Sequence, residues 1–596
     1  MLLAGCAGGG ESQPASTAKD AATSLATALS AGNLDGIQIN QGEPDPDLEA
    51  VYGGMNGLLP AVSVAHVSPT PNVATVKLAY AWPLSSPWTY ETEAVLVKDG
   101  DNWKLNWAPT VLHPRLTSTN RLERQRGEAS ERGNITGLGS AVLVEALPVQ
   151  MLGLDKTGLD QPTVEDSARR VADKAKIDPE AYLKKVHAAG PTAFVDATPV
   201  RQSELPADFL AIKGAAMRTV TVPAPKTTGF AQALLGRVGY ATAEQAAEVG
   251  NTVNEGDIIG VSGLQKTYDK ELRGSTGNRV FLADRAEAPG AGRATTSNIV
   301  ADFPDVPGQS LSTTIDDDVQ TAAEEALASV KVPASVAVVN TETGAILAAA
   351  DSAEARRTDA SMTQPVRPGL AGSPVTALAL IRSGVDLNER VTCEKQVVVG
   401  DRTIENADNY RGGNGQMTLA RAIAVQCETA IAAAHTRLDA AKVPEAAKSL
   451  GLGATYDIGV PMNLGEAAAP TGDVAKAEAL LGTNEGYQAS AIGLAAMAAS
   501  VKAKQPVVPF VVPGREFRTE GAVPLTDAEV KALDDLMRTN AGSYSPLSRV
   551  VTGTADGRSW AVGFGTDYAL AVVLTDDKNT STTTAQIARR VATAAR

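Results

Sequence analysis

Apolar and polar positions alternate in a way that predicts a small α+β domain at the start of the chain. Residues 18–34 repeat apolar side chains at helical spacing and end in Gly-Asn, which predicts a helix. Strand-like runs follow at 73–84, 90–100 and 101–116. The polar turn at 98–101 joins two alternating runs, so we expect a hairpin there.

The patterns change twice further along the chain. From about 136 to 300 short strands alternate with amphipathic helices, which are clearest at 164–178 and 243–257. Residues 288–309 are polar and rich in Pro and Gly, as expected of a boundary, and the polar stretch 113–135 predicts a linker or an extended pairing segment. Beyond 310, apolar strands at 335–351 and 558–576 alternate with Ala-rich helices.

Length and composition limit the class of protein. At about 150 residues per domain, 596 residues predict about four domains or three larger ones. The 53 basic and 68 acidic residues give a net charge of −15, which argues against a nucleic-acid partner. Apolar residues make up 43% of the chain but aromatic residues only 4%, so we expect cores built from aliphatic side chains. No stretch approaches 18 uncharged apolar residues, so we expect no membrane-spanning segment.

The first residues predict a location outside the cytoplasm. Leu3-Ala4-Gly5-Cys6 resembles a bacterial lipobox, in which the cysteine is lipidated, and residues 1–17 would then be the lipobox and a flexible tether. A lipidated Cys6 would anchor the protein to the outer face of the cytoplasmic membrane. Only five residues precede Cys6, fewer than a signal peptide needs, so either the start lies earlier or part of the signal is missing. The alternative is a chance match.

Several motifs along most of the chain point to one family. Residues 103–116 are similar to the end of a nuclear-transport-factor-like domain, and Arg126-Gly127 with Glu131-Arg132 resembles the entry into a pedestal domain. The most specific match is the segment Gly263-Leu264-Gln265, Tyr268-Asp269, Leu272-Arg273-Gly274 and Gly277. Residues 313–327, 338–348, 412–427 and 551–564 fit landmarks of a transpeptidase domain. Together these segments resemble the class B penicillin-binding proteins, exported transpeptidases that cross-link peptidoglycan.

The resemblance implies a multidomain α+β protein. It predicts a nuclear-transport-factor-like N-terminal domain at 18–115, a dimerisation or pedestal domain at 116–300, and a serine transpeptidase/β-lactamase-like α/β domain at 310–596. The family's chemistry uses Ser-x-x-Lys, which places nucleophile and base one helical turn apart. A Ser-x-Asn loop and a Lys-Thr-Gly strand complete the site, and the strand also contributes to the oxyanion hole.

The first motif is altered in this chain. The family's Pro-Gly-Ser-x-x-Lys is replaced by Pro368-Gly369-Leu370-Ala371-Gly372-Ser373. Leu370 then holds the nucleophile position and Ser373 the position of the base. If Ser373 is moved into the nucleophile position instead, Thr376 replaces the lysine and cannot act as a base near pH 7. Because Ser373 precedes Pro374, a role at the start of a helix is the alternative to a nucleophile.

The second and third motifs are altered as well. Gln426-Cys427-Glu428 stands where Ser-x-Asn is expected, and Val551-Thr552-Gly553-Thr554 where Lys-Thr-Gly-Thr is expected. Glu428 adds a negative charge and Val551 removes a positive one, so binding of a carboxylate should weaken along with catalysis. Thr552, Gly553 and Thr554 either form a ligand-binding edge or persist because the strand packs closely under a helix.

The remaining candidates are weaker. The Ser-x-x-Lys at Ser16 and Lys19 and the tripeptide Lys156-Thr157-Gly158 lie in contexts that do not build the site. Cys427 is either a small buried apolar residue or bridged to Cys393, which would close a loop of about 35 residues worth roughly 3–4 kcal/mol; we favour the bridge. The four histidines are dispersed (His66, His113, His187 and His435), and the sequence predicts neither a metal site nor a cofactor.

Three functional hypotheses follow. The first is a catalytically degenerate homologue that acts in cell-wall assembly as a scaffold or binder of peptidoglycan stem peptides or assembly proteins, with weak β-lactam binding at most. The second is an active D,D-transpeptidase that binds penicillin through an atypical site. The third is a non-covalent muropeptide or β-lactam sensor. Loss of a nucleophile costs on the order of 10⁶ in turnover, which favours the first hypothesis.

Overall fold

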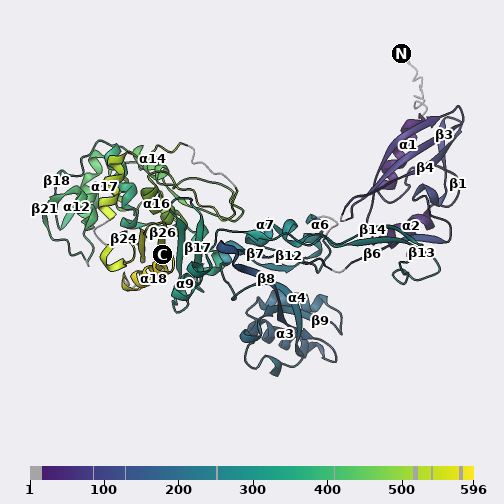
Figure 1. Cartoon of the computed structure of the whole chain (residues 1–596), viewed down its shortest axis with the longest axis horizontal. Helices are drawn as coiled ribbons and strands as arrows, with labels where there is room; N and C mark the ends of the chain where they lie inside the picture. The colour runs from purple at the N-terminus through teal and green to yellow at the C-terminus, as the bar shows by residue number, and fades with distance from the viewer. Residues whose placement is uncertain are drawn as a thin grey trace, which may run out of the picture. The chain divides into compact units, whose positions relative to one another are not determined.

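The computed structural model describes residues 17–84, 86–127, 129–249, 253–408, 410–514, 521–537, 541–575 and 581–596. The predicted lipidation site Cys6 lies outside these residues. Contacts within the chain define two compact units, both of which are drawn in Figure 1. Unit 1 contains residues up to 132, 240–258 and 273–309, and unit 2 contains 133–239, 259–272 and 310–596. The predicted domain boundaries stay predictions.

Unit 1 begins with helix α1 (Ala18–Ser30), which confirms the predicted helix. A capping box starts it, because Asp20 N donates to Thr17 Oγ1 at 3.1 Å and Thr17 N donates to Asp20 Oδ2 at 3.0 Å. A sheet follows in the order β1 (Ile39–Gln41), β5 (Asn102–Asn106), β4 (Trp88–Asp99), β3 (Val73–Trp82) and β2 (Ala61–Pro69). Asp99 pairs with Asn102 in this sheet, so the predicted hairpin is also confirmed.

The core of this N-terminal sheet differs from the prediction of aliphatic cores. Tyr80 and Trp82 are 1% exposed, and the Tyr80 ring stacks on Tyr90 with centroids 5.2 Å apart. Trp82 Nε1 donates to the Tyr90 hydroxyl at 2.9 Å, and that hydroxyl donates to the Leu112 carbonyl at 2.8 Å. The overall aromatic fraction was misleading because four of the five tryptophans lie between residues 82 and 107.

The rest of unit 1 is an extended three-stranded sheet. Strand β13 (Asn278–Asp284) lies between β6 (Asn120–Arg126) and β14 (Ile299–Phe303). The predicted polar stretch 113–135 therefore contains a pairing strand, and the Pro/Gly-rich stretch 288–309 contains another. Two short helices, α2 (Asp45–Gly54) and α6 (Ala243–Val249), complete the unit.

Unit 2 contains a small α/β lobe in residues 133–239. Strand β8 (Val142–Asp155) pairs with β7 (Ile135–Thr136), β9 (Phe194–Val200) and β10 (Ala215–Pro225), and β7 pairs with β15 (Leu311–Ser312). Helices α3 (Gln161–Ala175) and α4 (Pro179–Ala188) enclose a mainly aliphatic core against β8 and β9, to which Tyr182 and Phe209 also contribute. Both helices begin with an aspartate N-cap and proline in the first turn, as helix-start preferences predict.

The large domain of unit 2 is a five-stranded sheet between two helical layers. The strand order is β17 (Ile346–Asp351), β16 (Ala334–Asn340), β26 (Tyr568–Thr575), β25 (Arg558–Phe564) and β24 (Arg549–Ala555). The apolar strands predicted within 335–351 and 558–576 are thus confirmed as β16, β17, β25 and β26, while residue 576 lies outside the described residues. Side chains of β16 alternate between two cores, one shared with α16 (Ala491–Ala503) and the other with α9 (Asp317–Leu327) and α18 (Ser581–Ala594). Strand β24 is an edge of this sheet.

The remaining elements are shorter, and three of them, α8, β11 and β12, include residues of both units. The helices are α5 (Gln232–Leu235), α7 (Gly263–Thr267), α8 (Asp269–Arg273), α10 (Ala360–Thr363), α11 (Ser373–Arg382), α12 (Leu419–Ala424), α13 (Glu428–Ala433), α14 (Lys442–Ser449), α15 (Asp473–Leu481) and α17 (Asp527–Met537). The strands are β11 (Val238–Tyr240), β12 (Ile258–Gly260), β18 (Arg390–Cys393), β19 (Gln396–Val399), β20 (Arg402–Glu405), β21 (Gly415–Thr418), β22 (Gly465–Ala467) and β23 (Tyr487–Ala489). Among the described residues, no helix has the length and apolar character needed to cross a membrane.

Candidate functional site

The predicted nucleophile position lies on a short 3₁₀ turn, η6 (Gly369–Gly372), directly before α11. Leu370 is 5% exposed and belongs to the large apolar core of unit 2. The turn lies against the edge strand, because a Cβ added to Gly369 would stand 2.4 Å from the Thr554 carbonyl oxygen, and Gly369 has φ +55°. A buried isobutyl group therefore occupies the predicted nucleophile position, and an isobutyl group cannot be acylated.

Neither Ser373 nor Thr376, the two residues that could stand at the position of the base, can act as one. Ser373 is the first residue of α11, followed by Pro374, so its position agrees with a role at the helix start. Thr376, one turn further on, is buried and its Oγ1 donates to the Leu480 carbonyl at 2.9 Å. A hydroxyl held by a backbone carbonyl cannot replace an amine as a proton acceptor.

The second motif forms the connection between α12 and α13. Gln426 has φ +65°, a left-handed conformation that is uncommon for a residue with a side chain. Its Nε2 donates to the Thr552 carbonyl oxygen at 2.6 Å and to Thr552 Oγ1 at 3.0 Å. The side chain at the position predicted for the family's first serine thus connects this loop directly to β24. The sequence predicts the substitution at position 426 but not this contact, because motif spacing carries no signal for it.

The middle residue of the same motif is covalently anchored. Cys427 forms a disulfide with Cys393, the last residue of β18, with their Cα atoms 6.1 Å apart. Both cysteines are buried, at 0% and 1% exposure. The bond ties the loop that carries Gln426 to the small sheet formed by β18 and β21.

The third motif lies on β24, where each residue faces a different environment. Val551 is 5% exposed and packs in the same apolar core as Leu370. A Cβ added to Gly553 would stand 2.2 Å from the backbone nitrogen of Ala371, so β24 and η6 touch at this glycine. Close packing therefore supplies a reason for Gly553 that involves no ligand, while a ligand-binding role for Thr552, Gly553 and Thr554 stays a prediction.

A polar cavity of about 600 Å³ lies beside these motifs in unit 2. It is formed by β20, the start of α13, α15 with the loop after it, and the turns flanking η6 and β24. Its lining residues are Arg367, Arg402, Thr403, Ile404, Glu405, Glu428, Glu478, Leu481, Thr483, Asn484, Glu485 and Asp556. Five carboxylates and two guanidinium groups line it, which gives a formal charge of 2 − 5 = −3.

The charges of this cavity are only partly paired. Arg367 Nε lies 3.1 Å from Asp556 Oδ2, and Arg402 forms an ion pair with Glu478. Both cations are thus engaged by carboxylates. Glu428 is half-buried, and burial raises the pKa of its carboxyl above the ordinary value. An anionic ligand would meet a net negative lining here, to which Glu428 contributes, whereas Val551 does not line this cavity.

The other sequence candidates are structural or lie elsewhere. Lys156, in the apparent Lys-Thr-Gly tripeptide, is buried, and its Nζ donates to the Val186 and Ala189 carbonyls at 2.8 and 2.6 Å. It therefore caps the end of α4 and does not serve a reaction. Ser16 lies outside the described residues. Within those residues no group of three or more His, Cys, Asp or Glu side chains could hold a metal ion.

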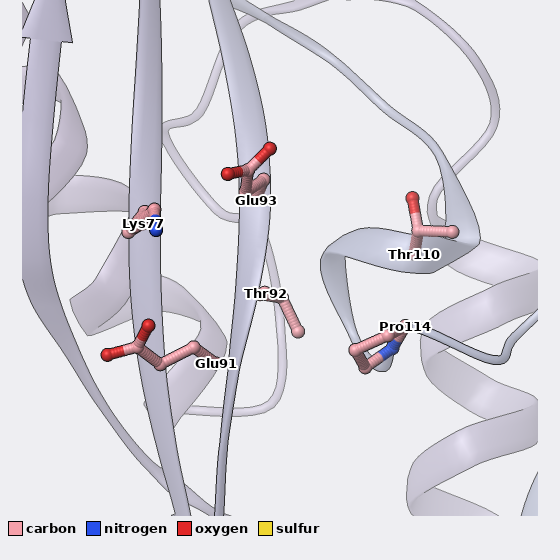
Figure 2. A pocket seen from close by; sticks show the side chains of 6 residues that line it. All are labelled: Lys77, Glu91, Thr92, Glu93, Thr110 and Pro114. Carbon is pink, nitrogen blue, oxygen red and sulfur yellow. The ribbon is translucent and has the colours of Figure 1, made fainter.

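A second depression, of about 380 Å³, lies on the N-terminal sheet of unit 1 (Figure 2). Lys77 of β3 lies beside Glu91 and Glu93 of β4, while Thr92 of the same strand points toward Thr110 and Pro114. Lys77 and Glu93 are directly opposed in the sheet register. None of the predicted site residues lines this depression, so it belongs to a different surface from the altered motifs.

Comparison with known families matches three consecutive parts of the chain. Residues 18–120 match the NTF2-like N-terminal transpeptidase domain, 128–313 the penicillin-binding protein dimerisation domain, and 334–593 the penicillin-binding protein transpeptidase domain. These matches confirm the predicted fold class. No curated protein matches the chain in a sequence search.

Proposed function

Because the chain belongs to the class B penicillin-binding proteins with an NTF2-like N-terminal domain, we propose that it is a catalytically inert member that serves cell-wall biogenesis by binding. The observation that carries the proposal is Leu370, a buried apolar side chain at the nucleophile position of η6. The partners are peptidoglycan stem peptides or proteins of cell-wall assembly. A β-lactam would bind weakly, since it can form no acyl bond at Leu370.

Three further features support inertness. Ser373 stands where the lysine base would be, Thr552 is already engaged by Gln426, and the adjacent cavity carries an excess of carboxylates. Because nucleophile and base act as a unit, the absence of either costs about as much as the absence of both. The folded transpeptidase domain would therefore present a surface rather than a reaction centre.

Fluorescent penicillin tests this proposal directly. We expect purified full-length protein to carry no covalent label after incubation that saturates an active relative, since acylation should be slower by about 10⁶. The measurement is in-gel fluorescence with peptide mapping by mass spectrometry. Stoichiometric label on Ser373, or on any other residue of unit 2, would establish the atypical-transpeptidase alternative instead.

We also propose that the chain is held on the outer face of the cytoplasmic membrane by a lipid on Cys6, as its Leu-Ala-Gly-Cys context indicates. A lipid anchor requires that cysteine, so Cys6→Ser should move the exported protein from the membrane fraction to the soluble fraction. Fractionation followed by immunoblotting measures the shift. Retention of the Cys6→Ser protein on membranes would rule out this anchor.

A further inference from the structure

The edge of strand β24 is occupied by the chain itself at consecutive outward-facing positions. Gln426 Nε2 donates to the Thr552 carbonyl at 2.6 Å, which shows that the backbone groups of Thr552 face away from β25. In an antiparallel strand, residues two apart direct their backbone groups to the same edge, so those of Thr554 face the same way. There the turn η6 lies against the strand, since a Cβ added to Gly369 would stand 2.4 Å from the Thr554 carbonyl oxygen.

The contact made by Gln426 has the chemistry of a docking peptide. A strand that adds to a sheet edge donates backbone amide N–H groups to the carbonyl oxygens of that edge. The Gln426 carboxamide donates the same kind of N–H group to the Thr552 carbonyl and also reaches Thr552 Oγ1. It thereby fills the hydrogen-bonding position that a peptide N–H would need.

The loop that carries Gln426 is held in place by backbone hydrogen bonds to α12 and by the disulfide. Cys427 N donates to the Ala422 carbonyl at 2.8 Å, and Gln426 N donates to the Ile423 carbonyl at 3.1 Å. The disulfide from Cys427 to Cys393 adds a covalent anchor immediately beside Gln426. The left-handed backbone conformation at Gln426 is unfavourable by itself, and these hydrogen bonds and the disulfide hold the residue in it.

We propose that Gln426 is a built-in occupant of the β24 edge, an autoinhibitory strap that closes this edge to extended peptides. Ligand access to β24 then requires the Gln426 side chain to leave Thr552, whereas the neighbouring cavity lined by Glu428 stays open to other ligands. The inference deepens the proposed function and rests on it in one respect, since it treats the altered site as a binding surface.

Titration with an uncharged peptide tests the strap. The probe is a tri-alanine peptide with an acetyl group at its N-terminus and an amide at its C-terminus, so that the charges near Glu428 have little influence. Full-length wild type, Gln426→Gly and the control Gln416→Ala are compared by NMR. Glycine adopts φ +65° without strain, so the Gln426→Gly protein should keep its loop. Gln416 is an exposed glutamine on β21.

We expect Gln426→Gly to bind the peptide about tenfold more tightly than wild type, because two internal hydrogen bonds no longer compete. The shifted resonances should lie on β24, and Gln416→Ala should behave as wild type. Equal affinity of all three folded proteins, or tighter binding with shifts away from β24, would overturn the strap. Penicillin labelling of wild type would instead refute inertness, so the two failures are distinguishable.

Discussion

Introducing the family's residues at the five positions predicted to be altered is expected to make the protein react with penicillin. The variant carries Leu370→Ser, Ser373→Lys, Gln426→Ser, Glu428→Asn and Val551→Lys. Positions 370 and 373 lie three residues apart across η6 and the start of α11, so a hydroxyl and an amine there would be one turn apart. The labelling rate should rise by several orders of magnitude, up to about 10⁶ over wild type.

The structure gives reasons to expect room for these groups. Leu370 and Val551 are both 5% exposed members of the large apolar core, and Leu370→Ser removes volume from that core. Replacing Gln426 frees the Thr552 carbonyl and hydroxyl on β24. The polar cavity beside these elements gives the probe a route of approach.

Matched controls separate chemistry from folding. Leu370→Ser alone should stay unlabelled, because an unactivated hydroxyl without a base is a poor nucleophile. The four other substitutions with Leu370 kept should also stay unlabelled. Stopped-flow or in-gel fluorescence gives the rate, and calorimetry gives the melting temperature. If the variant with all five substitutions folds but is not labelled by penicillin, the inertness has a cause beyond these positions.

The sequence predicted most of the architecture because hydrophobic period and turn chemistry act locally. Helix α1 and the β4–β5 hairpin are specified by residues within a few positions of one another. The aliphatic-core prediction was wrong for the N-terminal sheet because a composition average conceals where Tyr80 and Trp82 lie. The sequence predicted a boundary where strand β14 lies. Its local pattern does not indicate a strand, because β14 is stabilised by pairing with β13.

Motif spacing predicts which residues belong to the candidate site but not how those residues contact one another. Motif spacing alone placed Leu370, Gln426 and Val551 at altered positions. Spacing cannot reveal that Gln426, 126 residues before Thr552, donates to its carbonyl. Nor does it show that Gly553 packs on the backbone of Ala371, which depends on how a turn and a strand distant in sequence approach each other.

Removal of the Cys393–Cys427 bridge is expected to destabilise unit 2 strongly. The bond joins residues 34 apart in sequence, and closing a loop of that size restricts the unfolded chain by about 3–4 kcal/mol. The variant Cys393→Ala with Cys427→Ala should therefore lower the melting temperature of the large domain by roughly 5–8 °C. Differential scanning calorimetry of the oxidised full chain resolves this transition from that of the N-terminal sheet.

The third cysteine supplies the control for this measurement. Cys6→Ser removes a sulfur that takes no part in the bridge, so both transitions should keep the wild-type midpoint. Because the bridge also anchors the loop of Gln426, its loss should raise hydrogen exchange over the segment around 425–428 while the N-terminal sheet stays unchanged. An unchanged midpoint in the double variant would mean that packing around Cys393 and Cys427, rather than the covalent bond, holds this loop against β24.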